Sequence, residues 1–140
     1  MVNTVYTAWF DGSTNVGMQR SGIGWIIKQG NRTLITCSKE ILFNKSITKI
    51  EYLALIDLLE FLDKYKYTNI TDITIYGDNK TVIKQVTEIF MVGSNVSYWT
   101  KARGLLGRLG DATIYWVSGK YNLADSLSKE YYYLIDNKGV

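Results

Sequence analysis

The sequence contains no histidine and a single cysteine, Cys37, and these two shortages exclude several kinds of active site. Without histidine there is no Ser-His-Asp or Cys-His nucleophile, no histidine general base and no histidine-ligated zinc. One cysteine provides neither a cysteine-rich zinc site nor an intramolecular disulfide, and it fits a reducing compartment. If the chain is an enzyme, its chemistry therefore rests on carboxylates, with or without hard metal ions that prefer oxygen ligands.

Long apolar runs are also missing. No stretch approaches the roughly 20 apolar residues of a membrane-spanning helix, and no basic start precedes an apolar segment, so we expect a cytoplasmic protein without membrane contact. The 140 residues are 46% hydrophobic and show no linker, which favours one domain over residues 1-140. The net charge of +3 permits a polyanionic partner without requiring one. The oligomeric state stays unknown, and a monomer is the simplest expectation.

The N-terminal part alternates apolar and polar residues with the period of β-strands, which predicts an antiparallel meander of three strands. We expect the first strand to run from Tyr6 to Asp11 and the backbone to turn at Gly12. Gly22 and Gly24 lie inside the second strand and indicate a bulge or a close backbone contact. The second and third strands are predicted at Gly22 to Gln29 and Arg32 to Ile41, with a tight turn at Gly30 and Asn31.

After the meander, helical periodicity alternates with two further strands. This order predicts an α/β fold with a five-stranded mixed sheet, in which the first three strands are antiparallel and the fourth and fifth are parallel, flanked by helices. The predicted elements are a helix at Ser46 to Tyr65, a strand at Asp72 to Asn79, helices at Thr81 to Phe90 and Tyr98 to Leu109 separated by a break at Gly93 and Ser94, a strand at Ala112 to Val117 and a helix at Asn122 to Ile135.

Four acidic residues are expected to meet at one edge of this sheet. Asp11 and Asp78 each follow an apolar strand, and a right-handed crossover would set these strands side by side and parallel. Glu51, in the first turn of the intervening helix, points with the buried rows, although an acid near a helix N-terminus also has a structural explanation. Asp125 opens the last helix within reach. Divalent cations would relieve the repulsion among such carboxylates.

The chain resembles the ribonuclease H superfamily, in its ribonuclease HI and reverse-transcriptase-like branch. The resemblance extends from about Val5 to Leu134, with the elements in the order of that family, and implies the ribonuclease H-like fold. Each motif alone is weak, and their order and spacing make the likeness strong. The matching residues are Asp11-Gly12-Ser13, Glu51, Tyr76-Gly77-Asp78-Asn79, and Trp116-Val117 leading through Asn122 to Ala124-Asp125-Ser126-Leu127-Ser128.

This resemblance implies an endoribonuclease that hydrolyses the RNA strand of RNA/DNA hybrids with two Mg²⁺ ions, or Mn²⁺ as a substitute, and leaves 5′-phosphate products. Asp11, Glu51 and Asp78 match the core metal-binding acids of the family, and Asp125 matches the fourth. The resemblance further implies substrate contacts from the backbones of Gly12 and Ser13 and from the side chains of Asn15, Ser46, Thr48 and Asn79, with Ser46 and Thr48 equally well explained as helix caps.

Two features depart from the family. Many relatives carry a histidine on the loop after the fifth strand, whereas Lys120 stands at the matching position here and is either a substrate contact or a solvated loop charge. The stretch Glu88 to Trp99 is too short and too poor in basic residues for the basic handle of some relatives. The affinity for a hybrid would then depend on dispersed basic residues, namely Lys80, Lys84, Lys101 and Arg103.

These departures leave other functions open. The chain is alternatively a catalytically weak or inactive nucleic-acid-binding or adaptor domain with the ribonuclease H fold, because a fold alone does not fix a function. It is also conceivable as a partner subunit of a polymerase or replication assembly. If it is a nuclease, double-stranded RNA, DNA and junctions remain alternative substrates.

Overall fold

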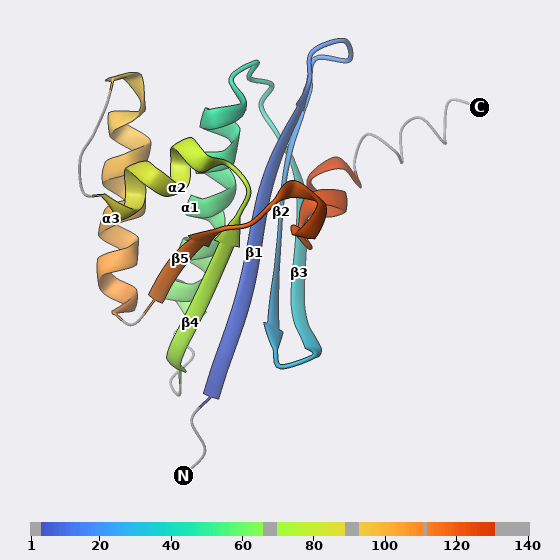
Figure 1. The fold of residues 1–140 in the computed structure, drawn as a ribbon. Coiled ribbons are helices and arrows are strands. Elements are labelled where there is room, and N and C mark those ends of the chain that lie inside the picture. The colour runs from blue at the N-terminus through green and yellow to red at the C-terminus, as the bar shows by residue number, and fades with distance from the viewer. Residues whose placement is uncertain (1–3, 66–69, 89–92, 111, 131–140) are drawn as a thin grey trace.

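The centre of the computed structural model is a five-stranded mixed sheet with the strand order β3-β2-β1-β4-β5 (Figure 1). β1 (Thr4–Asn15) pairs antiparallel with β2 (Arg20–Gln29), which pairs antiparallel with β3 (Arg32–Ile41). β4 (Ile70–Gly77) runs parallel to β1, and β5 (Ala112–Trp116) runs parallel to β4. The predicted fold class and strand directions are confirmed. The structure describes residues 4–65, 70–88, 93–110 and 112–130.

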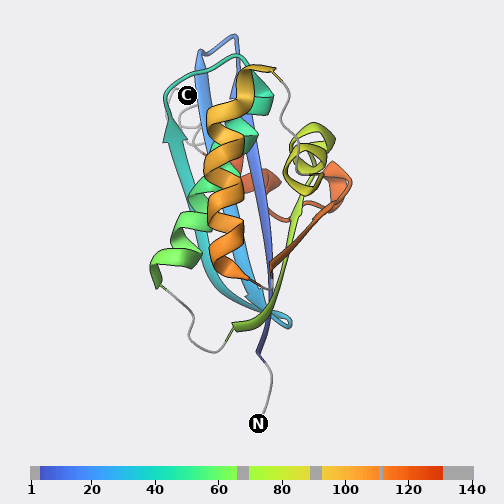
Figure 2. The same cartoon turned by 90° about the vertical axis from the view of Figure 1, so that its left-hand side faces the viewer.

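Helices cover both faces of the sheet. α1 (Ile47–Tyr65) packs on β1 and β2, and α3 (Val96–Leu109) lies against α1 on its outer side, as Figure 2 shows. α2 (Lys80–Thr87) follows β4 near its carboxyl end. Residues 125–130 are helical and lie on the opposite face. The 3₁₀ turns η1 (Gly93–Asn95) and η2 (Gly119–Tyr121) precede α3 and follow β5. No helix in these ranges is long and apolar enough to cross a membrane.

The core forms between α1 and the sheet because each element concentrates its apolar residues on one side. Tyr6, Ala8 and Phe10 alternate along β1 and are buried, as the two-residue period of a strand predicts. Their partners on α1 recur at the helical spacing of three and four residues. These buried α1 residues are Ile50, Ala54, Leu55, Leu58, Leu59 and Leu62. This packing of α1 against β1 determines where the first turn of α1 lies relative to the sheet.

The predicted turn at Gly12 is wrong. β1 continues through this residue to Asn15, because antiparallel pairing with β2 persists from Asp11 opposite Gly24 to Asn15 opposite Arg20. Gly12 has a different use. A Cβ atom there would lie 2.7 Å from Ile50 Cγ2, so only glycine lets the start of α1 approach β1 this closely.

The close backbone contact predicted for Gly22 and Gly24 is confirmed. A Cβ atom on Gly22 would lie 2.4 Å from the Ser128 carbonyl oxygen, and one on Gly24 would lie 2.6 Å from the Ser128 nitrogen. Because these two positions on β2 have no side chain, the helix of residues 125–130 packs directly on the β2 backbone. Ser38 on β3 also donates a hydrogen bond to the Leu127 carbonyl oxygen over 2.6 Å.

Several helix boundaries differ from the prediction: α1 begins at Ile47 rather than Ser46, α2 ends at Thr87 rather than Phe90, and α3 begins at Val96 rather than Tyr98. α2 begins at Lys80, one residue early, because Asn79 Oδ1 accepts a hydrogen bond from the Val82 N–H and caps the helix. The terminal helix begins at residue 125 rather than at Asn122, whose side chain instead accepts a hydrogen bond from the Ala124 N–H. Phe90 itself and the predicted end of the terminal helix, Ile135, lie outside the described residues.

Candidate metal centre

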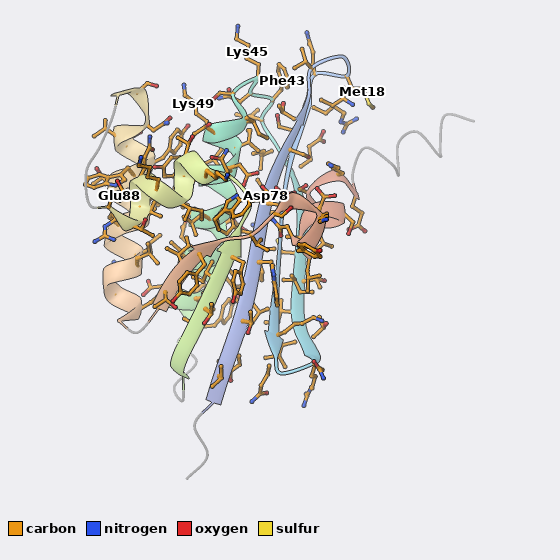
Figure 3. The ribbon with its side chains drawn as sticks, in the orientation of Figure 1. Met18, Phe43, Lys45, Lys49, Asp78 and Glu88 are labelled. Carbon is orange, nitrogen blue, oxygen red and sulfur yellow. The ribbon has the colours of Figure 1, made fainter. Side chains whose placement is uncertain are left out.

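Three carboxylates meet at the carboxyl end of β4, beside the part of β1 that continues past it. Asp11 comes from β1 and Glu51 from the first turns of α1, and Asp78, labelled in Figure 3, directly follows β4. Each offers an oxygen atom, and these oxygens all lie within 4.8 Å of one another. The parallel pairing of β1 with β4 brings the two aspartates together, and the glycine contact at Gly12 brings Glu51 to them. The structure thus assembles three of the four predicted acids.

Two of the three acids are buried and have raised pKa values, while Asp78 is half-buried. Asp11 is 4% exposed and Glu51 is 2% exposed. Burial raises the pKa of Asp11, and the charges of Asp78 and Asp125 raise it further. Burial likewise raises the pKa of Glu51, which then donates its proton to Asp11 in a hydrogen bond between the two carboxyl groups. The Gly12 backbone N–H also donates to Glu51, and this hydrogen bond acts in the opposite direction and lowers the pKa of Glu51.

Asp125 lies at the margin of this cluster. Its charge acts on Asp11, but its side chain is 48% exposed and accepts a hydrogen bond from Lys129 Nζ over 3.1 Å. It is not among the carboxylates that share the 4.8 Å neighbourhood in the described part of the chain. Asp125 therefore lies near the cluster as a half-exposed acid that is paired with Lys129.

Two residues without a predicted role contact the acids directly. Ser128, which is 1% exposed, donates a hydrogen bond from Oγ to Asp11 Oδ2 over 3.1 Å. Asn122, which is 5% exposed, donates from Nδ2 to the Phe10 carbonyl oxygen and to Asp78 Oδ2 over 2.9 and 3.2 Å. The only sequence signal for them was their place in the Asn122 to Ser128 motif. Their partners lie more than 40 positions away along the chain.

The predicted substrate contacts in the β1–β2 hairpin have partners within the protein. Ser13 is buried, and its Oγ donates to the Ser128 carbonyl oxygen over 2.7 Å, which ties β1 to the helix of residues 125–130. Asn15 Oδ1 accepts a hydrogen bond from the Met18 N–H over 3.0 Å and shapes the hairpin turn. Both side chains therefore have structural uses of their own.

The other predicted contacts begin helices or lie on a loop. Ser46 precedes α1, and its Oγ accepts a weak hydrogen bond from the Lys49 N–H at 3.5 Å, as the capping alternative predicts. Thr48 lies in the first turn of α1, half-buried. Asn79 caps α2. Lys120 is exposed on η2, with its ammonium 5.1 Å from the centroid of the Tyr121 ring.

The dispersed basic residues do not form one surface around the acids. Lys101 pairs with Glu60 at 3.4 Å between α3 and α1, and Arg103 Nη1 donates to the Val86 carbonyl oxygen at the end of α2. Lys84 is exposed on α2. Lys80 lies nearest the acids, because it opens α2 two residues after Asp78.

The chemistry of the cluster fits a divalent cation. Glu51 Oε2 is buried and has no hydrogen-bond partner among the described residues, although a buried carboxylate oxygen normally has one. Three converging carboxylates form an all-oxygen donor set, which suits hard ions such as Mg²⁺ and Mn²⁺. A bound cation would satisfy the orphaned oxygen and offset the repulsion that raises both pKa values.

The chain belongs to the reverse transcriptase-like family, whose profile matches residues 9–130, and with it to the ribonuclease H superfamily. This match covers most of the chain and includes all four predicted acids. No curated protein sequence matches the chain significantly.

Solved structures of ribonucleases H have the same fold. Ribonuclease H1 from the archaeon Halobacterium salinarum is 26% identical with a TM-score of 0.79, over 95% of this chain and 98% of that chain. The N-terminal ribonuclease H domain of a Mycobacterium tuberculosis protein is 18% identical with a TM-score of 0.80, over 98% and 99%. LC11 ribonuclease H1, isolated from compost and solved with an RNA/DNA hybrid, is 20% identical with a TM-score of 0.79, over 89% and 94%.

Proposed function

We propose that this protein is a divalent-metal-dependent ribonuclease H that cuts the RNA strand of RNA/DNA hybrids and leaves 5′-phosphate ends. The observation that carries the proposal is the buried cluster of Asp11, Glu51 and Asp78 with its unpartnered Glu51 oxygen. The complex of the LC11 relative with an RNA/DNA hybrid supports this choice of substrate.

In this proposal the three acids hold Mg²⁺ ions, which supply water activation and stabilisation of the departing 3′ oxygen. Asp11 is central because it contacts Glu51 and is repelled by Asp78 and Asp125 at once. Ser128 and Asn122 keep the carboxylates of Asp11 and Asp78 in fixed orientations. Asp125, half-exposed beside Lys129, serves as the peripheral fourth acid.

The same proposal assigns recognition of the RNA strand to polar groups around the cluster. A 2′-hydroxyl is both a donor and an acceptor, and it distinguishes RNA from DNA. Thr48 and Lys120 present polar side chains for such contacts. The side chains of Asn15 and Asn79 hold internal hydrogen bonds, so any contact that they make to substrate uses their remaining hydrogen-bonding capacity, whereas Gly12 and Ser13 would contact substrate through the backbone.

The direct test compares cleavage of a labelled RNA/DNA hybrid by the wild-type protein and by Asp11→Asn and Asp78→Asn. We expect Mg²⁺-dependent cleavage by the wild type and a loss of at least about 100-fold in both variants, because each removes a carboxylate from the donor set. Glu88→Gln is the matched control, since Glu88 is an exposed acid at the end of α2. Cleavage that survives in both aspartate variants would refute the proposal. Double-stranded RNA and duplex DNA in the same assay determine the substrate class.

A non-catalytic nucleic-acid-binding or adaptor domain is the second candidate. The observation that favours it is the pairing of Asp125 with Lys129 outside the carboxylate cluster, together with a lysine in place of the loop histidine. Calorimetric titration with Mg²⁺ separates the two functions. A nuclease centre is expected to bind the cation in the wild type and to lose that binding in Asp11→Asn, whereas a degenerate site would give no titratable signal in either protein.

A further inference from the structure

Two exposed aromatic side chains flank the Asp78 end of the carboxylate cluster, and each has a lysine ammonium over its ring. Trp116, at the end of β5, is 44% exposed and lies 4.6 Å from Lys80 Nζ, measured to the ring centroid. Tyr121, in η2, is 61% exposed and lies 5.1 Å from Lys120 Nζ. We refer to these four residues as the aromatic–lysine edge.

This edge is attached to Asp78 itself. The Trp116 indole donates from Nε1 to the Asp78 carbonyl oxygen over 3.0 Å, which fixes the plane of the ring beside the cluster. Gly119 packs against Asp78, since a Cβ atom there would lie 3.5 Å from Oδ2. Asn122, the residue after Tyr121, donates to the same Oδ2 atom. Both aromatic residues therefore belong to segments that contact Asp78 directly.

Among the described residues, neither of the two lysines forms an ion pair. The ion pairs in this part of the chain engage Arg20, Lys39, Lys101, Arg108 and Lys129 instead. Unpaired cations beside exposed aromatic rings match a polyanion that carries flat, apolar groups.

The position and exposure of the rings indicate which form of polynucleotide fits. β5 is an edge strand of the sheet (Figure 1), with Trp116 at its carboxyl end and Tyr121 in the turn that follows it. Bases inside a duplex are stacked on each other and cannot stack on a side chain, whereas unpaired bases can. Tyr115 is the other exposed aromatic residue of β5. Its ring centroid lies 6.1 Å from that of Tyr76, which in turn stacks on Trp9, so Tyr115 has a packing role on the opposite face.

We propose that the aromatic–lysine edge binds a single-stranded segment of a polynucleotide next to the carboxylate cluster. Trp116 and Tyr121 stack unpaired bases, while Lys80 and Lys120 bind the phosphates between them. The use of this segment by a nuclease rests on the proposed function, but the binding does not. A hybrid with a single-stranded extension is then a better ligand than a blunt hybrid of the same sequence.

The test measures binding without cleavage. Fluorescence anisotropy in EDTA, with labelled oligouridylate and oligothymidylate as separate probes, should give about tenfold weaker binding for Trp116→Ala and a clear loss for Tyr121→Ala. Tyr115→Ala is the matched control on the same strand and should bind like the wild type. Lys80→Ala should reduce the slope of log K against log salt by about 0.7, the value for one phosphate contact on a single strand.

Binding of either probe with this pattern supports the site, and the preferred probe shows whether RNA or DNA is the natural strand. Binding of neither probe by the wild type would overturn it, as would equal losses in Tyr115→Ala and Tyr121→Ala. Circular dichroism verifies the folding of each variant, and Trp116→Leu, which removes the aromatic ring but keeps apolar volume, replaces Trp116→Ala if the latter unfolds. Because no metal is present, failure here leaves hybrid cleavage intact, whereas failure of the proposed function leaves this binding intact.

Discussion

Ser128 Oγ donates a hydrogen bond to Asp11 Oδ2 over 3.1 Å, inside the protein and 117 positions away along the chain. The same hydroxyl also lies 2.8 Å from the Asp125 carbonyl oxygen, so one side chain connects the first and the fourth predicted acid. A hydrogen bond to a charged group contributes about 1.5–3 kcal/mol, which is enough to set the orientation of a carboxylate.

Ser128→Ala should therefore weaken the metal site more than the fold. With the donor gone, Asp11 loses a fixed rotamer, and we expect the Mg²⁺ concentration for half-maximal hybrid cleavage to rise about tenfold. The measurement is a Mg²⁺ titration of the cleavage rate. Ser126→Ala, an exposed position on the same helix, is the control and should keep the wild-type titration curve. A Ser128→Ala curve that overlays the wild type would show that Ser128 does not act on the metal site.

The buried acids predict an unusual pH dependence of stability in EDTA. Burial and neighbouring charge raise the pKa of Asp11 and of Glu51 above their ordinary values of 3.8 and 4.5. The folded state thus binds these protons more tightly than the unfolded state does. Their stabilising effect is therefore complete below about pH 4 and is lost as the pH rises through the pKa values of the folded state. The free energy of unfolding, measured with urea, should show this contribution declining from about pH 4 towards neutrality. The slope should be up to about 1.4 kcal/mol per pH unit for each proton that only the folded state retains.

Two further experiments distinguish the titration of Asp11 and Glu51 from that of groups elsewhere in the protein. Saturating Mg²⁺ at neutral pH should restore stability, because a cation replaces the shared proton. Glu51→Gln should flatten the profile in EDTA, since the amide donates to Asp11 without titrating. A wild-type profile with the same slope as Glu51→Gln would assign the pH dependence to groups elsewhere.

Gly24 is predicted to be essential for docking the helix of residues 125–130. Gly24→Ala places a methyl group 2.6 Å from the Leu127 Cβ atom, and we expect it to cost about 1–3 kcal/mol of unfolding free energy. Gly107→Ala is the contrasting variant. Gly107 lies inside α3 with nothing within 4 Å, so alanine there should stabilise the protein by about 1 kcal/mol. Thermal unfolding of both variants measures the two signs, and equal effects would contradict the docking role.

The sequence predicts those parts of this protein that local periodicity governs. β3 and the end of α1 at Tyr65 were predicted at their observed bounds, and the predicted parallel pairing of the first and fourth strands correctly brought Asp11 close to Asp78, although β1 continues past Asp11. The continuation of β1 past Gly12 depends on pairing with β2, which no local pattern encodes. The contact of Ser128 with Asp11 likewise cannot be predicted from local sequence, because a serine on a predicted helix gives no sign of a partner on the first strand.

Asn122 joins three elements through one amide, and this makes it the most informative position to vary. Its Nδ2 atom donates to the Phe10 carbonyl oxygen and to Asp78 Oδ2, while its Oδ1 atom accepts from the Ala124 N–H. Asn122→Asp preserves the shape and the acceptor but replaces the donor, which lies 3.2 Å from Asp78 Oδ2, with a carboxylate oxygen. Asn122→Ala removes all three bonds.

The two variants should differ in a way that separates positioning from folding. Asn122→Ala should lose about 1–3 kcal/mol of unfolding free energy, because it leaves a buried carbonyl oxygen unsatisfied. Asn122→Asp should lose stability mainly in EDTA at neutral pH, where an added negative charge repels Asp78, and should recover it in Mg²⁺ or at acidic pH. Urea unfolding with and without Mg²⁺ measures both. If Mg²⁺ rescued neither variant, Asn122 would be a structural link between β1 and the last helix, with no influence on the carboxylate cluster.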